Sequence, residues 1–360
     1  MPLVQILTPG FVFPNSRALL FPLLIWKKTL ARRGIRLRIV DAADRLRTSD
    51  VLVVDSKYHR DRWLTDPDDI VADFVRFRDV AGKVIYCDTT DSTGWLQTEL
   101  LPVVDRYWKF QLLRDRAAYL RPMYGHRVFT DYYHRIHGVC DAEPAWSAAV
   151  SDPAFLAKLD VCWNSGMADY SLPGFYRTAC SLRLPVPGLV RFPSARAFVS
   201  PLTPRSNEVS CRFGVGYSRA TVAWQRLTIR ARLEHRFSFG RVSRHRYFAE
   251  LRRSKIALSP FGFGEVCYRD FECFLSGTLL IKPDMQHLET WPDLFDAGET
   301  MLAHSWDLSD LEAVIDQALS GYGEMVAMAR EGQERYRRHL AGPMAAELFC
   351  DHLEQLLARK

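Results

Sequence analysis

Arg269 and Glu272 are the two side chains best suited, by type and spacing, to bind a small polar ligand. They lie three residues apart in a predicted helix that ends at Gly277, so both project from one helix face. The planar guanidinium of an arginine matches phosphate oxygens, and a carboxylate can accept two hydrogen bonds from a cis-diol. A phosphate-binding cation beside a hydroxyl-binding carboxylate predicts a nucleotide-sugar pocket. The alternative for both residues is an ion pair with a neighbour on a solvated helix face.

A glycine loop and two short strands surround this helix. Residues 256–258 are an apolar run typical of a buried parallel strand, and Gly262 and Gly264 then allow a tight turn with free backbone amides. Residues 279–281 form the next predicted strand, and Lys282 stands at its carboxyl end. Ligands bind at this end of parallel strands, so Lys282 is a candidate for phosphate binding. An ordinary loop lysine is the alternative.

A second glycine loop contains Gly214 and Gly216, between a predicted strand at 209–213 and a predicted helix at 219–233. A phosphate at the start of this helix would meet backbone amides and the positive end of the helix dipole. Arg219 would be repelled by the dipole if it faced only solvent, so we expect it to contact a phosphate. The two glycines do not make the complete dinucleotide-binding pattern.

Candidates for the acceptor side lie in the first part of the chain. Asp88 and Asp91 follow a predicted strand at 83–87, where a carboxylate could remove the proton of an attacking hydroxyl group. Alternatively, one aspartate caps the following helix and the other holds the loop. His134 and Asp169 lie in segments that combine aromatic rings with hydrogen-bond acceptors, as carbohydrate sites do. Each segment is equally consistent with a packed hinge.

The segment around Arg269 resembles the C-terminal donor-binding segment of exostosin-like glycosyltransferases and, more loosely, that of group 1 glycosyltransferases. The resemblance covers about residues 244–294 and rests on Ser254-Lys-Ile-Ala-Leu-Ser-Pro260 with Gly262, on Arg269-x-x-Glu272, and on Ser276-Gly277-Thr-Leu-Leu-Ile. It implies a GT-B fold, in which the N-terminal domain holds the acceptor and the C-terminal domain holds the nucleotide-sugar donor. It also implies that Glu272 binds donor hydroxyl groups, most often those of the ribose.

The chain departs from the group 1 pattern at one position. Those enzymes often carry a second glutamate eight positions before the residue that corresponds to Glu272. Gly264 occupies that position in this chain, and Glu265 lies one position later. Glu265 is therefore an open candidate for donor binding, and a retaining mechanism does not carry over. We expect an inverting transfer.

Strand and helix patterns alternate along the chain, which predicts an α/β fold. Strands are predicted at 4–7, 35–40, 51–54 and 83–87, with helices at 16–33 and after the acidic cluster at 66–69. The alternation resumes at 209–213, and helices at 324–340 and 345–358 end the chain. Between the two halves, the proline-rich residues 141–206 predict an irregular connector. Ser309 and Glu312 predict a capping box at the start of a further helix.

With 360 residues the chain exceeds the usual size of one hydrophobic core. We therefore predict two Rossmann-like domains with a cleft between them, an arrangement like that of GT-B enzymes. Residues 1–195 form the expected N-terminal acceptor domain with its connector, and residues 196–342 form the expected donor domain. Residues 343–360 form an expected helix that packs back on the N-terminal domain.

The composition sets outer limits on function. The net charge of +6 permits anionic partners such as nucleotides or a membrane surface. Eight cysteines without a CxxC pair predict reduced thiols in a cytoplasmic protein rather than metal ligands. The N-terminus lacks the features of a secretory leader, and no apolar stretch approaches the roughly 20 residues of a membrane span. A basic helix face could contact the inner face of an anionic membrane, or be merely solvated; it comprises Lys27, Lys28, Arg32 and Arg33.

The sequence thus predicts a glycosyltransferase that moves a sugar from a nucleotide-sugar to a saccharide or lipid-linked acceptor. No metal or cofactor is expected, because arginines, lysines and helix N-termini can stabilise the leaving group. One alternative is a non-catalytic glycan- or nucleotide-binding protein of the same fold. A less favoured alternative is a nucleic-acid-binding protein, for which no recognition motif is present. It is suggested by the basic residues Arg241, Arg244, Arg246, Arg252, Arg253 and Lys255.

Overall fold

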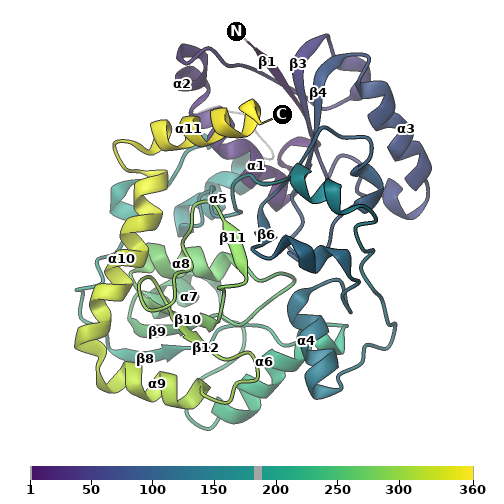
Figure 1. Ribbon diagram of the computed structural model, residues 1–360. Helices are drawn as coiled ribbons and strands as arrows, with labels where there is room; N and C mark the ends of the chain where they lie inside the picture. The colour runs from purple at the N-terminus through teal and green to yellow at the C-terminus, as the bar shows by residue number, and fades with distance from the viewer. Residues whose placement is uncertain (1, 182–188, 360) are drawn as a thin grey trace.

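The computed structural model describes residues 2–181 and 189–359. In the N-terminal half of these residues, parallel strands form one sheet in the order β2-β1-β3-β4-β5-β7 (Figure 1). The strands are β1 (Leu3–Leu7), β2 (Arg36–Val40), β3 (Ser49–Asp55), β4 (Ala81–Asp88), β5 (Arg106–Lys109) and β7 (Leu159–Val161). The helices of this half are α1 (Pro14–Ile25), α2 (Lys27–Arg32), α3 (Pro67–Phe77), α4 (Val128–His137) and α5 (Leu172–Ser181). The central strands β3 and β4 are almost wholly buried, as expected where helices cover both faces.

A second parallel sheet lies in the C-terminal half, with the order β12-β10-β9-β8 among the described residues. Its strands are β8 (Asn207–Ser210), β9 (Ser254–Leu258), β10 (Leu279–Pro283) and β12 (Leu302–His304). The accompanying helices are α6 (Ala220–Leu233), α7 (Arg244–Leu251), α8 (Tyr268–Ser276) and α9 (Leu311–Ser320). The two separate parallel sheets confirm the predicted α/β fold with two Rossmann-like domains.

A short antiparallel pair joins the two domains. Strand β6 (Gln111–Leu113) follows β5 directly and pairs with β11 (Leu288–Thr290) of the C-terminal half. Figure 1 shows this pair between the two sheets. Backbone hydrogen bonds therefore cross from one domain to the other as well as side-chain contacts.

The end of the chain returns to the N-terminal domain. Helix α10 (Tyr322–Leu340) leads from the second sheet to α11 (Ala345–Ala358), which lies beside α2 (Figure 1). Arg33, just after α2, donates hydrogen bonds to Glu347 at 2.9 Å and to Glu354 at 2.8 Å, and pairs with Asp351. Arg33 belongs to the basic helix face that was predicted to contact a membrane, and these ion pairs neutralise its charge. Among the described residues no helix combines the length and apolar character that crossing a membrane requires.

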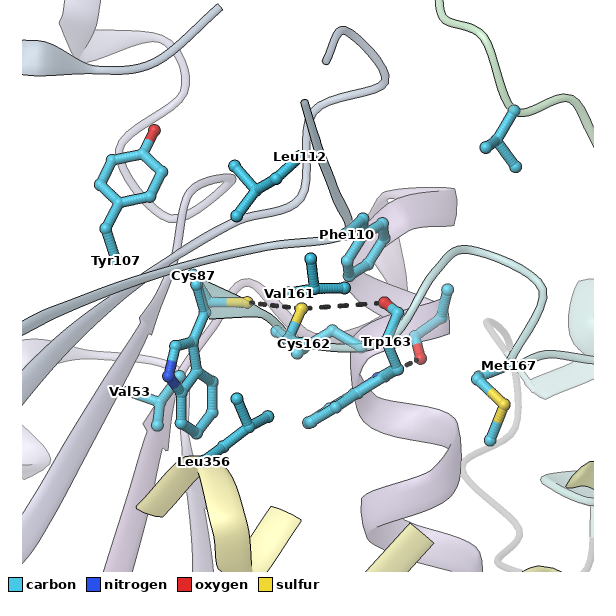
Figure 2. Close-up of a cluster of buried hydrophobic side chains, with 14 of the residues drawn as sticks. Val53, Cys87, Tyr107, Phe110, Leu112, Val161, Cys162, Trp163, Met167 and Leu356 are labelled. Carbon is cyan, nitrogen blue, oxygen red and sulfur yellow. Dashed lines mark hydrogen bonds between the residues drawn. The ribbon is translucent and has the colours of Figure 1, made fainter. Parts of the chain in front are cut away.

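Helix α11 also completes a hydrophobic core. Figure 2 shows Leu356 of α11 in the same cluster as Val53, Cys87 and Trp163. The sulfur atoms of Cys87 and Cys162 lie 4.0 Å apart, about twice the length of a disulfide bond. All eight cysteines are free thiols, and most are buried.

The single helix predicted over residues 16–33 is wrong. The chain forms α1 and α2 with a break at Trp26, where the backbone turns (φ −99°, ψ 14°). This turn places the Trp26 ring against Phe192 and Phe349, with ring centroids 4.9 and 5.1 Å away. Burial of a large aromatic side chain thus overrides the local helical pattern.

The prediction of an irregular connector over residues 141–206 is wrong in part. The segment contains β7, which pairs with β5 at the edge of the first sheet, and α5. Strand β7 has only three residues, too few to give a recognisable period in the sequence.

The predicted capping box at Ser309 and Glu312 is also wrong. Helix α9 begins one residue later, with Asp310 as its N-cap. The Ser309 hydroxyl instead donates to the carboxylate of Asp307 at 2.7 Å. The serine stabilises the preceding turn rather than the helix end.

A substitution at Gly277 tests how strongly the C-terminal end of α8 depends on a glycine. Its φ is +61°, and a Cβ atom there would lie 2.3 Å from the carbonyl oxygen of Val199. We expect Gly277→Ala to lower the free energy of unfolding by about 2–4 kcal/mol, measured by urea denaturation. Gly298→Ala is the matched control, because Gly298 has a φ of +87° and open space around it. An equal loss in both variants would show that the contact with Val199 contributes nothing.

Candidate functional site

A cavity of about 560 Å³ lies where the strands of the second sheet end. Its wall is formed by the glycine loop after β8, the segment that enters α7, and the glycine loop that leads from β9 into α8. Asp91 contributes to the wall from the N-terminal domain. Both predicted glycine loops, and the N-terminus of α8, therefore face one space beside the first domain.

Positive charge dominates this cavity. Of the described residues in its wall, five are arginines and two are acidic, Asp91 and Glu272. The arginines are Arg212, Arg226, Arg241, Arg244 and Arg269. Such a surplus of guanidinium groups favours a ligand that carries several negative charges, such as a diphosphate.

Arg226 of α6 holds the two glycine loops together. Its guanidinium donates to the carbonyl oxygens of Gly214 at 2.9 Å and Phe261 at 2.5 Å. It is only 4 % exposed, and burial lowers its pKa. In the described part of the chain Arg226 makes no ion pair with a carboxylate, and its charge is stabilised by carbonyl dipoles and by the rings of Phe213 and Tyr217.

Arg269 lies in the first turn of α8, as predicted, and lines the cavity. Its Nη2 donates to the carbonyl oxygen of Arg212 at 2.9 Å, and its Nε has no partner within residues 2–181 and 189–359. The guanidinium lies over the ring of Phe213, 5.7 Å from the centroid. The alternative of an ion pair with Glu272 is not observed among the described residues, and Nε is buried without a hydrogen-bond partner.

Glu272 lies one turn further along α8 and is buried, with 7 % of its surface exposed. One oxygen accepts a hydrogen bond from the Tyr247 hydroxyl at 2.8 Å, and the other pairs with Arg244 at 3.4 Å. Burial raises the pKa of Glu272, while the bond from Tyr247 and the charge of Arg269 oppose this rise. Two donors from α7 therefore fix the carboxylate at the cavity wall.

Asp91 is connected to the second domain through a chain of hydrogen bonds. Its Oδ1 accepts from the amide of Asn15 at 2.9 Å, and the amide oxygen of Asn15 accepts from the Tyr268 hydroxyl at 3.1 Å. Asn15 is near the start of α1 and Tyr268 is at the start of α8. The chain of contacts orients the Asp91 carboxylate across the boundary between the domains.

Gly264 explains why the second glutamate of the group 1 pattern is missing. A Cβ atom at Gly264 would lie 1.9 Å from the carbonyl oxygen of Asp91, so no side chain fits without separating the domains. Glu265 points away from the cavity and is fully buried. It accepts hydrogen bonds from the amide and hydroxyl of Thr93 at 3.2 and 2.9 Å, and burial raises its pKa. Glu265 therefore joins the domains and does not line the 560 Å³ cavity.

A second cavity, of about 350 Å³, adjoins the first. Arg244, Tyr268 and Glu272 line both. The rest of the second cavity is formed by α1, α5 and residues 168–170. Asp169, a predicted acceptor residue, lines this second cavity and pairs with Arg177. Glu272 therefore stands at the junction between a cavity of the second domain and one formed mainly by residues before 182.

Two predicted site residues are engaged in buried ion pairs. Lys282 is fully buried inside β10 and lies 3.1 Å from Asp270, so it does not reach the cavity. Asp88 pairs with Lys109 and accepts a hydrogen bond from Tyr107 at 2.8 Å. Burial alone raises the pKa of Asp88, but the charge of Lys109 and the hydrogen bonds from Lys109 and Thr90 together outweigh it, and the pKa falls below its usual value. Both residues therefore hold the fold together, where phosphate binding was predicted for Lys282 and proton removal for Asp88.

Arg219 and His134 also lie away from the cavity. Arg219 donates to the carbonyl oxygen of Gly125 at 3.0 Å. The first turn of α6 is already capped, because the amide of Thr221 donates to Asp141 at 2.8 Å. A carboxylate thus takes the place predicted for a phosphate. The His134 ring stacks on another aromatic side chain, and its Nδ1 contacts a backbone carbonyl, which matches the packed alternative.

Sequence reasoning missed Asn15, Tyr268 and Arg226, because their contacts join segments far apart in the chain. Arg241 and Arg244 were noticed only as part of a basic run. In the structure these two line the cavity, whereas Arg252 lies over the ring of Phe248 in α7 and Lys255 lies over the ring of Tyr322 in α10. The basic residues of this run therefore do not form one continuous surface. Among the described residues, no cluster of three histidine, cysteine or acidic side chains is arranged to hold a metal ion.

Comparison with known families supports this description of the second domain. Residues 193–348 match a family model described as "Glycosyl transferase-like". The match confirms the predicted glycosyltransferase class and is in keeping with the likeness to group 1 glycosyltransferases; the narrower likeness to exostosin-like enzymes stays a prediction. A search of curated proteins finds no match.

The solved structures that are similar to the whole chain include the following three. HepE of Anabaena in complex with UDP-glucose is 9 % identical, with 99 % of this chain and 100 % of that chain covered and a TM-score of 0.43. A glycosyltransferase of Rickettsia africae is 8 % identical, with 100 % and 99 % covered and a TM-score of 0.47. Sucrose-phosphate synthase of Thermosynechococcus elongatus is 12 % identical, with 100 % of each chain covered and a TM-score of 0.46.

The contact between Gly264 and Asp91 can be tested by a single methyl group. We expect Gly264→Ala to lower the free energy of unfolding by about 1–3 kcal/mol, because the methyl group forces the two backbones apart. Hydrogen exchange at residues 89–93 should become faster. Gly216→Ala in the facing glycine loop is the control, since a Cβ atom there meets nothing within 4 Å. Similar behaviour of the two variants would contradict the tight contact.

Proposed function

We propose that this glycosyltransferase-like protein transfers a sugar from a nucleotide-sugar in the 560 Å³ cavity to an acceptor bound beside it, against the N-terminal domain. The observation that carries the proposal is the convergence of five arginines with Asp91 and Glu272 on one cavity. The acceptor is a saccharide or a lipid-linked molecule. The protein acts in the cytoplasm, with Lys27, Lys28 and Arg32 of α2 exposed for contact with an anionic membrane.

The arginines supply the electrostatic stabilisation that sugar transfer needs. As the bond between the sugar and the phosphate breaks, the nucleotide leaves with the electron pair and gains negative charge. Arg226 and Arg269 bind carbonyl oxygens rather than carboxylates, so an incoming phosphate does not compete with an existing ion pair. Guanidinium groups can provide this stabilisation without a metal ion, and we propose a metal-independent transfer.

Glu272 is the proposed ligand of donor hydroxyl groups. Tyr247 and Arg244 keep its carboxylate in place and leave acceptor capacity on both oxygens. Its position in both cavities suits a residue beside the transferred sugar or the ribose. Gly262 and Gly264 offer backbone to the donor in the same wall.

Asp91 is the proposed general base of an inverting transfer. It would accept the proton of the acceptor hydroxyl while that oxygen attacks the sugar carbon and the nucleotide leaves from the opposite face. Asn15 positions the carboxylate, and Asp91 lines the same cavity as the arginines that would stabilise the leaving nucleotide. The absence of space for a carboxylate at Gly264 favours this assignment over one taken from retaining enzymes.

Donor binding is tested with Arg269→Ala and Glu272→Ala. We expect each variant to weaken binding of the best nucleoside diphosphate by about tenfold or more, because a charge-assisted hydrogen bond contributes about 1.5–3 kcal/mol. A calorimetric titration with UDP, GDP, ADP and CDP identifies the nucleotide in the parent protein. Arg246→Ala is the control, since Arg246 is exposed and lies outside the cavity wall. Unchanged affinity in both cavity variants would refute the donor site, and a loss of binding with EDTA would refute metal independence.

The role of Asp91 is tested by Asp91→Asn. We expect sugar transfer to slow by about 10²–10⁴-fold, because the amide cannot accept the proton, while nucleotide affinity stays within about twofold. Release of free nucleotide from a nucleotide-sugar panel gives the rate. A parent protein that binds nucleotide but releases none from any donor would be a binding protein. A variant as fast as the parent would exclude Asp91 as the base.

A further inference from the structure

The second cavity contains one cation that the described part of the protein leaves unneutralised. Its wall carries two cations and two carboxylates: Arg17, Arg244, Asp169 and Glu272. Glu272 pairs with Arg244, and Asp169 pairs with Arg177, which lies outside the wall. Within residues 2–181 and 189–359, the side chain of Arg17 forms no hydrogen bond and no ion pair. The cavity therefore has a net positive charge centred on Arg17.

The surroundings of Arg17 make this charge costly. The side chain is half-buried, and burial lowers its pKa. Its interacting titratable neighbours are Tyr170 and Tyr268, whose phenol groups are neutral at ordinary pH. Helix α1, which carries Arg17, has no acidic residue in its first turn. A bound anion would offset the cost of holding a desolvated cation here.

The remaining wall of the second cavity is mostly apolar. Phe21 of α1 and Phe175 of α5 face it, together with the ring of Tyr170 and the small side chains of Ala168 and Ala179. Aromatic and aliphatic walls favour an apolar ligand surface, and few polar groups are free to bind the hydroxyls of an unsubstituted sugar. The volume of about 350 Å³ limits the bound part to the size of a small organic group.

We propose that the second cavity binds the acceptor, and that this acceptor joins an anionic group, held by Arg17, to an apolar body that packs on Phe21 and Phe175. The inference rests on the proposed glycosyl transfer and narrows its acceptor class. The wall shared through Glu272 and Tyr268 places such an acceptor beside the donor and near Asp91. A phosphate joined to a hydrocarbon chain is the simplest molecule with both binding features, and the acceptor itself carries in addition the hydroxyl group whose proton Asp91 would accept.

The test compares three probes below their micelle concentrations by calorimetric titration. Octyl phosphate has both features, glucose 1-phosphate has the anion without the apolar body, and octyl glucoside has the apolar body without the anion. We expect octyl phosphate to bind at least tenfold more tightly than either of the others. Arg17→Gln should lower the affinity for octyl phosphate by about tenfold or more, and Arg17→Lys should lower it less. Ala179→Trp, at an exposed position of α5, should block the cavity without disturbing the fold.

Two matched variants separate this inference from the donor assignment. Arg17→Gln should leave the affinity for nucleoside diphosphates unchanged. Arg269→Ala should lower the affinity for the nucleotide but leave the affinity for octyl phosphate unchanged. Failure of nucleotides to bind would refute the donor site and leave the octyl phosphate result intact. The anionic group would be refuted if Arg17→Gln bound octyl phosphate as tightly as the parent protein does. It would also be refuted if the parent protein bound octyl glucoside as tightly as octyl phosphate. If the parent protein bound glucose 1-phosphate as tightly as octyl phosphate, the proposed apolar part of the acceptor would be refuted.

Discussion

The backbone contact between Gly264 and Asp91 is the constraint on which the candidate site depends. A Cβ atom at Gly264 would come within 1.9 Å of the Asp91 carbonyl oxygen, so the two domains meet at a position where only glycine fits. The contact places a carboxylate of the first domain against the cavity of the second. The neighbouring pair, Glu265 and Thr93, adds two buried hydrogen bonds across the same boundary. Burial raises the pKa of Glu265, because its charged form is destabilised away from water. The hydrogen bonds from Thr93 partly offset this destabilisation.

The cavity wall carries more arginines than acidic side chains, and only Arg244 and Arg212 pair with carboxylates among its described residues; this surplus of positive charge is unfavourable for the folded protein without a bound anion. Arg226 and Arg269 are held by carbonyl oxygens, and Arg17 in the adjoining cavity has no polar partner within the described residues. Sites that bind anions commonly reduce stability in this way, and a bound anion recovers it. The same arrangement explains why the two cavities can remain distinct. The pair of Glu272 with Arg244 stands between the cationic wall of the first cavity and the apolar wall of the second.

The domains are held by elements far from the cavity as well. The β6–β11 pair continues the backbone hydrogen bonding of one domain into the other, and α11 completes the core of the first domain after the chain has built the second (Figures 1 and 2). Arg33 binds three acidic residues of α11, which fixes the end of the chain against α2. The cleft geometry therefore depends on contacts at both ends of the sequence.

The sequence by itself determined the features that arise from short-range periodicity. Alternating strand and helix patterns set the two parallel sheets, and the spacing of Arg269 and Glu272 before Gly277 placed both residues on the helix that lines the cavity. Only the tertiary structure decided which charges stay free. Lys282 was a candidate for phosphate binding and Asp88 a candidate for the general base, but each meets an opposite charge on another element and becomes structural. The physical reason is that an ion pair forms wherever folding brings opposite charges together in a low dielectric, and sequence spacing carries no record of that distance.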